Sequence, residues 1–115
     1  MRYALLICDD ENNQLAASPE EGAAVMAEYA KWTEDAGARG VLQGGERLRP
    51  TTDATTVQVR GGEVLTSDGP FAETKEQIGG FFLVDCKDLD EAIELASKIP
   101  SARNGTIEVR PIWEM

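Results

Sequence analysis

Apolar and polar residues follow two spacings along this chain, and the spacings predict alternating strands and helices. Short runs rich in strand-forming side chains, some with strict alternation, predict strands at residues 2–8, 40–48, 80–86 and 106–112. Apolar residues recurring at three- and four-residue steps predict helices at residues 19–36 and 89–99.

The predicted helix ends carry their own signals. Ser18 can cap the first helix, Pro19 suits the first helical position, and Glu21 completes a capping box. Gly37 is expected to stop that helix. Asp88 is the expected cap of the second helix.

A hairpin separates the two halves of the chain. Residues 55–60 and 63–66 alternate as strands, and Gly61-Gly62 between them is a two-residue hairpin signal. Two βαβ units side by side then give a four-stranded antiparallel sheet with both helices on one face. We therefore expect one domain over residues 1–115, an α+β ferredoxin-like sandwich with an inserted hairpin.

Two strands are apolar on both faces, which is unusual for a sheet covered on one side. Residues 4–7 and 81–84 are uninterrupted apolar runs, whereas a sheet wetted on one face alternates. The second face must be covered, and we expect a second copy of the chain, a homodimer, to cover it.

Composition excludes several classes of function. The chain has 11 basic and 21 acidic residues, a net charge of −10, and no histidine. No basic field exists for nucleic acid or for an anionic membrane surface. Without histidine, the serine–histidine, cysteine–histidine and histidine–metal mechanisms fail. We expect no metal and no cofactor, and we expect residues 9–13 (Asp-Asp-Glu-Asn-Asn) to form a solvated loop rather than a calcium site.

The two cysteines, Cys8 and Cys86, lie in apolar surroundings without metal-ligand spacing. We expect reduced thiols in a cytoplasmic protein, placed close together on neighbouring parallel strands. No signal peptide or membrane span is expected.

The densest group of special residues is the loop at 66–76. Asp68, Glu73 and Lys75 are its candidate acid/base and ligand-binding groups. The structural interpretation is a tight turn, in which Asp68 bonds to nearby backbone N–H groups and Phe71 is buried. On spacing alone this interpretation is favoured.

Other candidates lie on the predicted strands and the first helix. Arg47 and Arg110 could hold an anionic group, and Arg110 should face away from the helices. The pair Gly44-Gly45 is more consistent with a β-bulge than with close approach of a ligand to the strand. Tyr29 and Trp32 read as core aromatics.

The motifs Asp68-Gly69-Pro70-Phe71, Glu73-Thr74-Lys75-Glu76, Gly79-Gly80-Phe81 and Glu108-Val109-Arg110-Pro111 resemble those of the YCII-related family, in the subgroup named for its Asp-Gly-Pro-Phe (DGPF) motif. The resemblance implies a ferredoxin-like dimeric α/β-barrel. It also suggests association with extracytoplasmic-function sigma factors. Related proteins have been proposed as enzymes because of a histidine–aspartate pair, which this chain cannot supply.

Two functions from different classes follow. The first is a small-molecule-binding or enzymatic dimer with a pocket between the sheet and the hairpin, presenting Asp68, Glu73 and Lys75 with Arg47 or Arg110. The alternative is a non-catalytic accessory module that binds a partner protein, such as a sigma factor, through its acidic surface.

Overall fold

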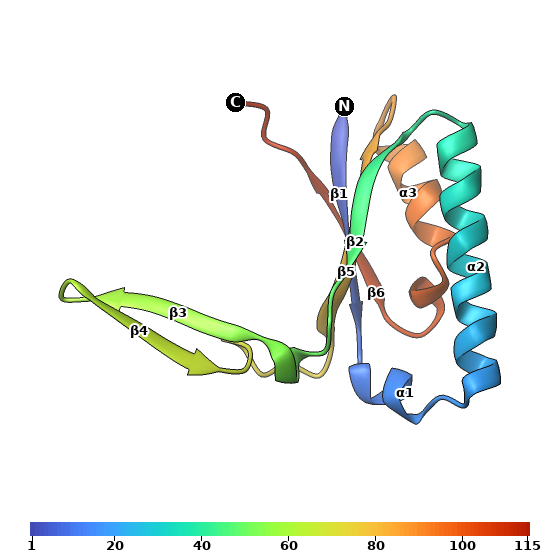
Figure 1. Cartoon of the computed structure of the whole chain (residues 1–115). Coiled ribbons are helices and arrows are strands. Elements are labelled where there is room, and N and C mark those ends of the chain that lie inside the picture. Colours follow the sequence, from blue (N-terminus) through green and yellow to red (C-terminus); the bar gives the residue numbers. More distant parts are fainter.

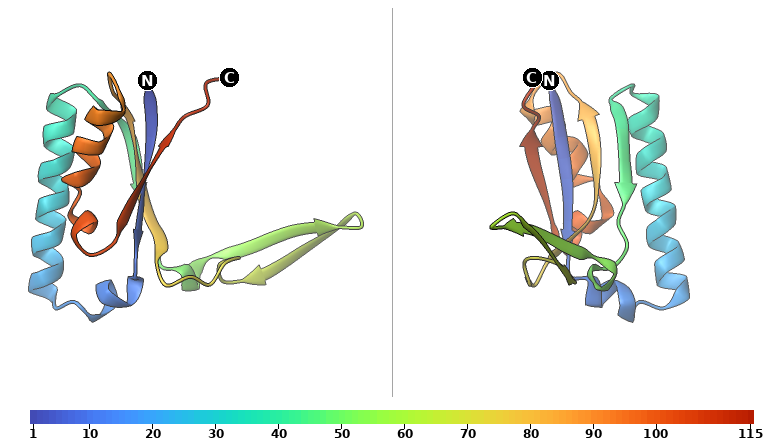
Figure 2. Two further views of the ribbon diagram at one scale, coloured as in Figure 1. Left: turned by 180° about the vertical axis from the view of Figure 1, so that it is seen from behind. Right: turned by 60° about the vertical axis from the view of Figure 1, so that its left-hand side comes forward.

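The computed structural model describes all 115 residues and contains two antiparallel sheets. The larger has four strands in the order β2-β5-β1-β6. Helices and a separate hairpin surround it (Figures 1 and 2). Its strands are β1 (Arg2–Asp9), β2 (Leu42–Arg47), β5 (Gln77–Asp85) and β6 (Thr106–Pro111).

The two long helices, α2 (Pro19–Ala38) and α3 (Leu89–Ser97), pack on one face of this sheet (Figure 1). The strand order and the one-sided helices are those of a ferredoxin-like α+β sandwich, as the sequence predicts. The core lies between the layers, where Leu5, Val84 and Ile99 are almost fully buried. Trp32 joins them, as expected of a core aromatic, and its indole N–H donates to the Leu95 carbonyl at 2.9 Å.

Both predicted helix caps are confirmed. The Ser18 side chain accepts a hydrogen bond from the Glu21 N–H at 3.1 Å, and Asp88 accepts from the Glu91 N–H at 2.9 Å. The predicted end of α2 is wrong by two residues, because the helix runs through Gly37 to Ala38. The glycine with left-handed backbone is Gly40, at φ 74°.

The segment expected as a solvated loop contains a short helix, α1 (Glu11–Ala16). Asp10 caps it by accepting from the Asn12 N–H at 3.0 Å. Glu11 then accepts from the Thr51 N–H at 3.1 Å, and its own N–H donates to the Gln77 side chain. These long-range contacts, invisible to local spacing, fix α1 against the start of β5.

The other face of the sheet carries no helix, and the apolar runs supply it with side chains. In β1, Tyr3, Leu5 and Ile7 are buried under the helices, so Ala4 and Leu6 lie on the opposite face. Register places Leu6 beside Phe81, and Ala4 beside Leu83. The expectation of apolar groups on both faces is confirmed.

The remaining strands, β3 (Thr55–Arg60) and β4 (Glu63–Asp68), form the predicted hairpin and pair only with each other. Gly61 and Gly62 both have positive φ, 57° and 82°, as a tight two-residue hairpin turn requires. We call this hairpin, residues 55–68, the arm. It projects from the side of the sheet opposite the helices (Figures 1 and 2).

The expected proximity of the two cysteines is wrong. β1 and β5 are neighbours but run antiparallel, with Cys8 opposite Ile78. The Cys86 N–H instead bonds to the Met1 carbonyl, at the far end of β1. Seven strand residues at about 3.4 Å each separate the cysteines by roughly 24 Å, far beyond disulfide reach. Both thiols are free.

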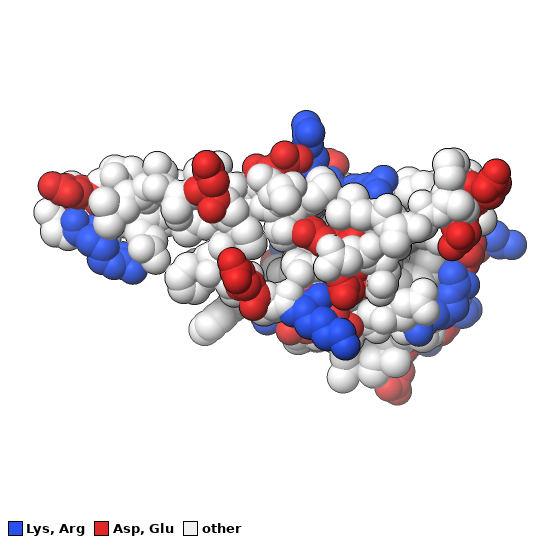
Figure 3. All heavy atoms as spheres, turned by 90° about the horizontal axis from the view of Figure 1, so that it is seen from below, with Lys and Arg blue, Asp and Glu red and all other residues white.

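Two further global features bear on function. No helix here combines the length and apolar character needed to cross a bilayer. On the face shown in Figure 3, acidic and basic side chains are interspersed over the body instead of forming one acidic patch.

Candidate functional site

A cavity of about 600 Å³ opens between the sheet and the helices α1 and α2. Its volume is typical of sites for small molecules. The sheet forms its floor, the first half of α2 forms a wall, and the 3₁₀ turn Pro100–Arg103 closes one end.

The floor comes from β2 and β5, whose residues reach the helix side by strand alternation. Arg47 pairs with Gly80, and Gly45 pairs with Phe82. At Gly45 a Cβ would lie 2.6 Å from the Phe81 carbonyl oxygen and 2.6 Å from the Phe82 ring. This position therefore needs glycine because of close packing between strands. The predicted bulge in β2 is confirmed, between Leu42 and Gly44.

Two hydroxyl groups meet at the closed end of the cavity. The Tyr29 hydroxyl, from α2, lies 2.6 Å from the Ser101 Oγ. The Tyr29 ring stacks on Phe82 at 6.5 Å between centroids. Burial raises the pKa of Tyr29, so this group stays a neutral hydroxyl that can donate a hydrogen bond.

Charged groups of both signs line the same cavity. The Asp9 carboxylate raises the pKa of Tyr29 and the Arg47 guanidinium lowers it, although both effects are smaller than that of burial. Both charges therefore lie within electrostatic range of the Tyr29 hydroxyl. One Asp9 oxygen accepts from the Asp10 N–H at 2.8 Å.

The two arginines of the cavity have different partners. Arg103 forms a two-pronged ion pair with Glu28, at 2.6 and 3.1 Å. Arg47 has no carboxylate within 4.0 Å, and the only hydrogen bond from its side chain goes to the Met26 sulfur at 3.7 Å. Thioether sulfur is a weak acceptor, so the guanidinium keeps its capacity for an anion.

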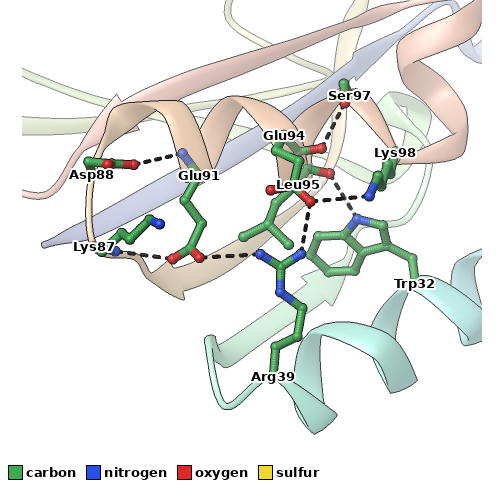
Figure 4. A network of polar contacts seen from close by, with 9 residues as sticks. All are labelled: Trp32, Arg39, Lys87, Asp88, Glu91, Glu94, Leu95, Ser97 and Lys98. Atoms are coloured by element: carbon green, nitrogen blue, oxygen red, sulfur yellow. Dashed lines mark hydrogen bonds and ion pairs between the residues drawn. The ribbon is translucent and has the colours of Figure 1, made fainter.

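A second hollow, of about 620 Å³, lies between α2 and α3. The charged groups between its two helices, Arg39 of α2 and Lys98 beside α3, are already bonded to carboxylates of α3 (Figure 4). Arg39 bridges Glu91 and Glu94 at 3.2 Å each, and Lys98 reaches Glu94 at 3.1 Å. The ion pairs across this hollow therefore hold α2 and α3 together.

Of the residues that the sequence suggested, Arg47 alone lines the cavity between the sheet and α2. Asp68, Glu73 and Lys75 are exposed, at the base of the arm and in the loop after it. Arg110 faces the helix-free side, as expected, where it pairs with Glu108 at 2.5 Å. The sequence places the pocket against the hairpin, whereas the cavity that Arg47 lines is on the helix side of the sheet.

The Asp-Gly-Pro-Phe turn also differs from its expected form. Asp68 ends β4, where its backbone pairs with Thr55, and its carboxylate accepts no hydrogen bond. Phe71 is 80% exposed instead of buried. Gly69 in this turn has a positive φ, 97°, and its N–H donates to the Ala54 carbonyl at 2.7 Å.

Sequence reasoning missed three groups of the cavity. Asp9 was placed in a solvated loop, Tyr29 was assigned to the core, and Ser101 carried no signal. The one available hint was that a Tyr hydroxyl on an apolar stripe needs a polar partner. Nothing local indicated that the partner is Ser101, 72 residues away.

Comparison with known proteins identifies the family of this chain. The model of the YCII-related domain matches residues 1–115. The chain belongs to the YCII-related family. An uncharacterised protein of Rhizobium meliloti (strain 1021) is 43% identical over 114 residues, covering 97% of this chain and 92% of its own. In this YCII-related chain no three Cys, Asp or Glu side chains gather as a metal site would require.

Proposed function

We propose that this YCII-related protein binds a small anionic molecule in the helix-side cavity, with Arg47 holding the anionic group. The proposal rests on the guanidinium of Arg47, which forms no ion pair. Acidic residues outnumber basic ones by 21 to 11, and five of the seven arginines are ion-paired. An arginine without a carboxylate in a cavity wall is available to a ligand.

The other polar groups suggest the rest of the ligand. Tyr29 and Ser101 offer neutral hydroxyls, and Asp9 offers an acceptor of opposite charge to Arg47. A carboxylate or phosphate that also bears a hydroxyl or amine satisfies all of them. Phe82 and Val25 supply apolar walls for its carbon frame.

A thermal-shift screen of small carboxylates and organic phosphates, followed by calorimetric titration of the best binder, tests the proposal. A ligand at 100 times its Kd adds about 2.7 kcal/mol of stability to the folded state. Arg47→Gln should weaken the Kd at least about tenfold, because it removes a charge-assisted bond. Arg60→Gln is the matched control, since Arg60 also lacks a carboxylate but lies at the tip of the arm.

The same titration distinguishes the cavity site at Arg47 from a site at the Asp-Gly-Pro-Phe loop. Asp68→Asn and Lys75→Gln should leave the Kd unchanged, because neither residue lines the cavity. If these variants abolish binding and Arg47→Gln does not, the site lies at the Asp-Gly-Pro-Phe loop and the present proposal is wrong.

We further propose that two copies pair through the helix-free face and so close a barrel, as expected of the DGPF subgroup, in the cytoplasm. Leu6, Phe81 and Leu83 supply the apolar contact. Among the charged residues of this face, Arg2 pairs with Glu114 at 2.7 Å and Arg110 pairs with Glu108, whereas Glu46, the cross-strand neighbour of Phe81, has no basic partner within 4.0 Å. Light scattering at micromolar concentration should give twice the chain mass of 12.5 kDa.

The accessory-module alternative has less support. It needs an acidic surface that a sigma factor or similar basic partner could recognise. On the face shown in Figure 3, lysines and arginines interrupt the acidic side chains.

A further inference from the structure

The arm has no partner within its own chain. Its strands β3 and β4 pair only with each other, and it extends away from the body (Figure 1). A lone two-stranded hairpin is at best marginally stable in water, and stability usually needs a third strand or a packed face. The arm therefore requires a cover that the single chain does not provide.

The surface area that a partner would bury can be estimated from the dimensions of the whole molecule. Its radius of gyration is 16.0 Å, against about 13 Å for a compact domain of this length. Its accessible surface is 7998 Å², against about 6,200 Å² for a monomer of this mass. The excess of about 1,800 Å² exceeds the roughly 800 Å² that each partner contributes to a standard interface.

The surface of the arm is suited to apolar packing. Val57, Val59 and Val64 share one face, because Val59 is cross-strand from Val64 and Val57 is two residues away. They are 60%, 58% and 69% exposed. Charged residues occur only at the tip and at the base, so most of the arm is uncharged in Figure 3.

The direction of the arm places it beside the helix-free face of the sheet. It leaves the body on the side of the helix-free face, and the C-terminal tail turns toward the same side (Figures 1 and 2). Trp113 in that tail is 89% exposed. The helix-free face is therefore flanked by two projecting apolar segments.

We propose that the arm clasps a second copy of this chain, with the valine face of each arm packed against the body of the other. The inference rests on the pairing proposed above and extends it. A second copy fits because a twofold arrangement covers both helix-free faces and both arms at once. The two ion pairs beside the sheet, Arg2–Glu114 and Arg110–Glu108, add no net charge at this face and so reduce the repulsion between two chains of net charge −10.

Paired substitutions on the two faces of the arm test this inference in the full chain. Val57→Lys with Val59→Lys places two charges on the valine face. Gln58→Lys with Ser67→Lys adds the same two charges to the opposite face. Since lysine reduces the net negative charge, general repulsion cannot account for dissociation.

Sedimentation equilibrium should show the valine variant dissociating about 100-fold more readily than wild type, with the control within about threefold. Urea titrations followed by circular dichroism report whether each variant has kept its fold. Dimers of unchanged affinity in the valine variant would overturn the inference.

Leu83→Lys, on the sheet face, separates this inference from the pairing it extends. If Leu83→Lys dissociates the dimer and the valine variant does not, the pairing stands and the clasp is wrong. If the valine variant dissociates and Leu83→Lys does not, the clasp stands and sheet pairing is wrong. A monomeric wild type overturns both.

Discussion

Gly44 and Gly45 are adjacent in sequence but differ in what surrounds them. A Cβ at Gly45 would collide with the backbone of Phe81 and the ring of Phe82, whereas a Cβ at Gly44 meets nothing within 4 Å. The collision is with backbone on one side, which cannot move aside cheaply. The pair thus gives a matched test of packing between β2 and β5.

We predict that Gly45→Ala lowers the free energy of unfolding by about 2 kcal/mol through overpacking. Gly44→Ala should change it by less than about 0.5 kcal/mol, as at an open site. Urea titrations followed by circular dichroism provide the measurement. Equal losses in the two variants would show that the strands lie farther apart than the structure places them.

At the same scale, residue type predicted some roles and failed at others. Ser18 and Asp88 were identified because a cap acts on an N–H group three residues away, within reach of sequence reasoning. Asp68 and Phe71 were misjudged because their environment depends on the direction in which the arm leaves the body. Arg47 was found as a charge on a strand, without knowledge of the cavity it lines.

Among the elements, the contact between α2 and α3 depends on exposed carboxylates. Hydrogen bonds from Lys98 and Arg39 lower the pKa of Glu94 below its ordinary value, and a bond from Arg103 does the same for Glu28. A carboxylate with a lowered folded-state pKa stabilises the fold above its ordinary pKa. That contribution is lost as the pH falls through the lowered value.

We therefore predict that the urea midpoint falls as the pH is lowered from about 5 to 3. Glu94→Gln should be less stable at pH 7 and should lose less on acidification. High salt should shrink the difference between the variant and wild type at pH 7, because these pairs are solvent-exposed. A wild-type midpoint that rises on acidification would contradict this account.

The order of elements followed from periodicity, but their contacts did not. Apolar spacing identified the four core strands, the two long helices and the Gly61-Gly62 turn. It missed α1, whose two Asn residues and preceding Asp9-Asp10 resemble a loop and whose Glu11 is fixed by Thr51, 40 residues away. It also placed Cys8 near Cys86, because the direction of neighbouring strands is a property of the whole sheet.

At the scale of the whole molecule, the two tryptophans occupy opposite environments. Trp32 is 6% exposed in the core, and Trp113 is 89% exposed in the C-terminal tail. The cavity is likewise a whole-molecule feature, since Asp9, Tyr29, Arg47 and Ser101 come from four separate elements or turns. No window of sequence contains this combination, so only the folded chain reveals it.

We predict that fluorescence emission shifts to the blue as the protein concentration rises through the dimer dissociation constant. Trp113 should move from water into an apolar contact, while Trp32 stays buried throughout. Trp113→Phe should remove the concentration dependence and retain the Trp32 emission. An emission maximum constant from nanomolar to micromolar protein in wild type, with light scattering showing dimers, would place the tail outside the contact.

The hydrogen bond between Gly69 and Ala54 closes the arm at its root and changes the order in which the sheet can assemble. β2 and β5 are neighbours, yet residues 48–76 lie between them, and the arm takes up residues 55–68. Once the arm has zipped, the flexible connection is roughly halved, which lowers the entropic cost of closing it by about 0.6 kcal/mol. A hairpin forms in about 1–10 μs. Even a transiently paired arm, as a lone hairpin is, therefore brings two distant strands closer together before the core forms.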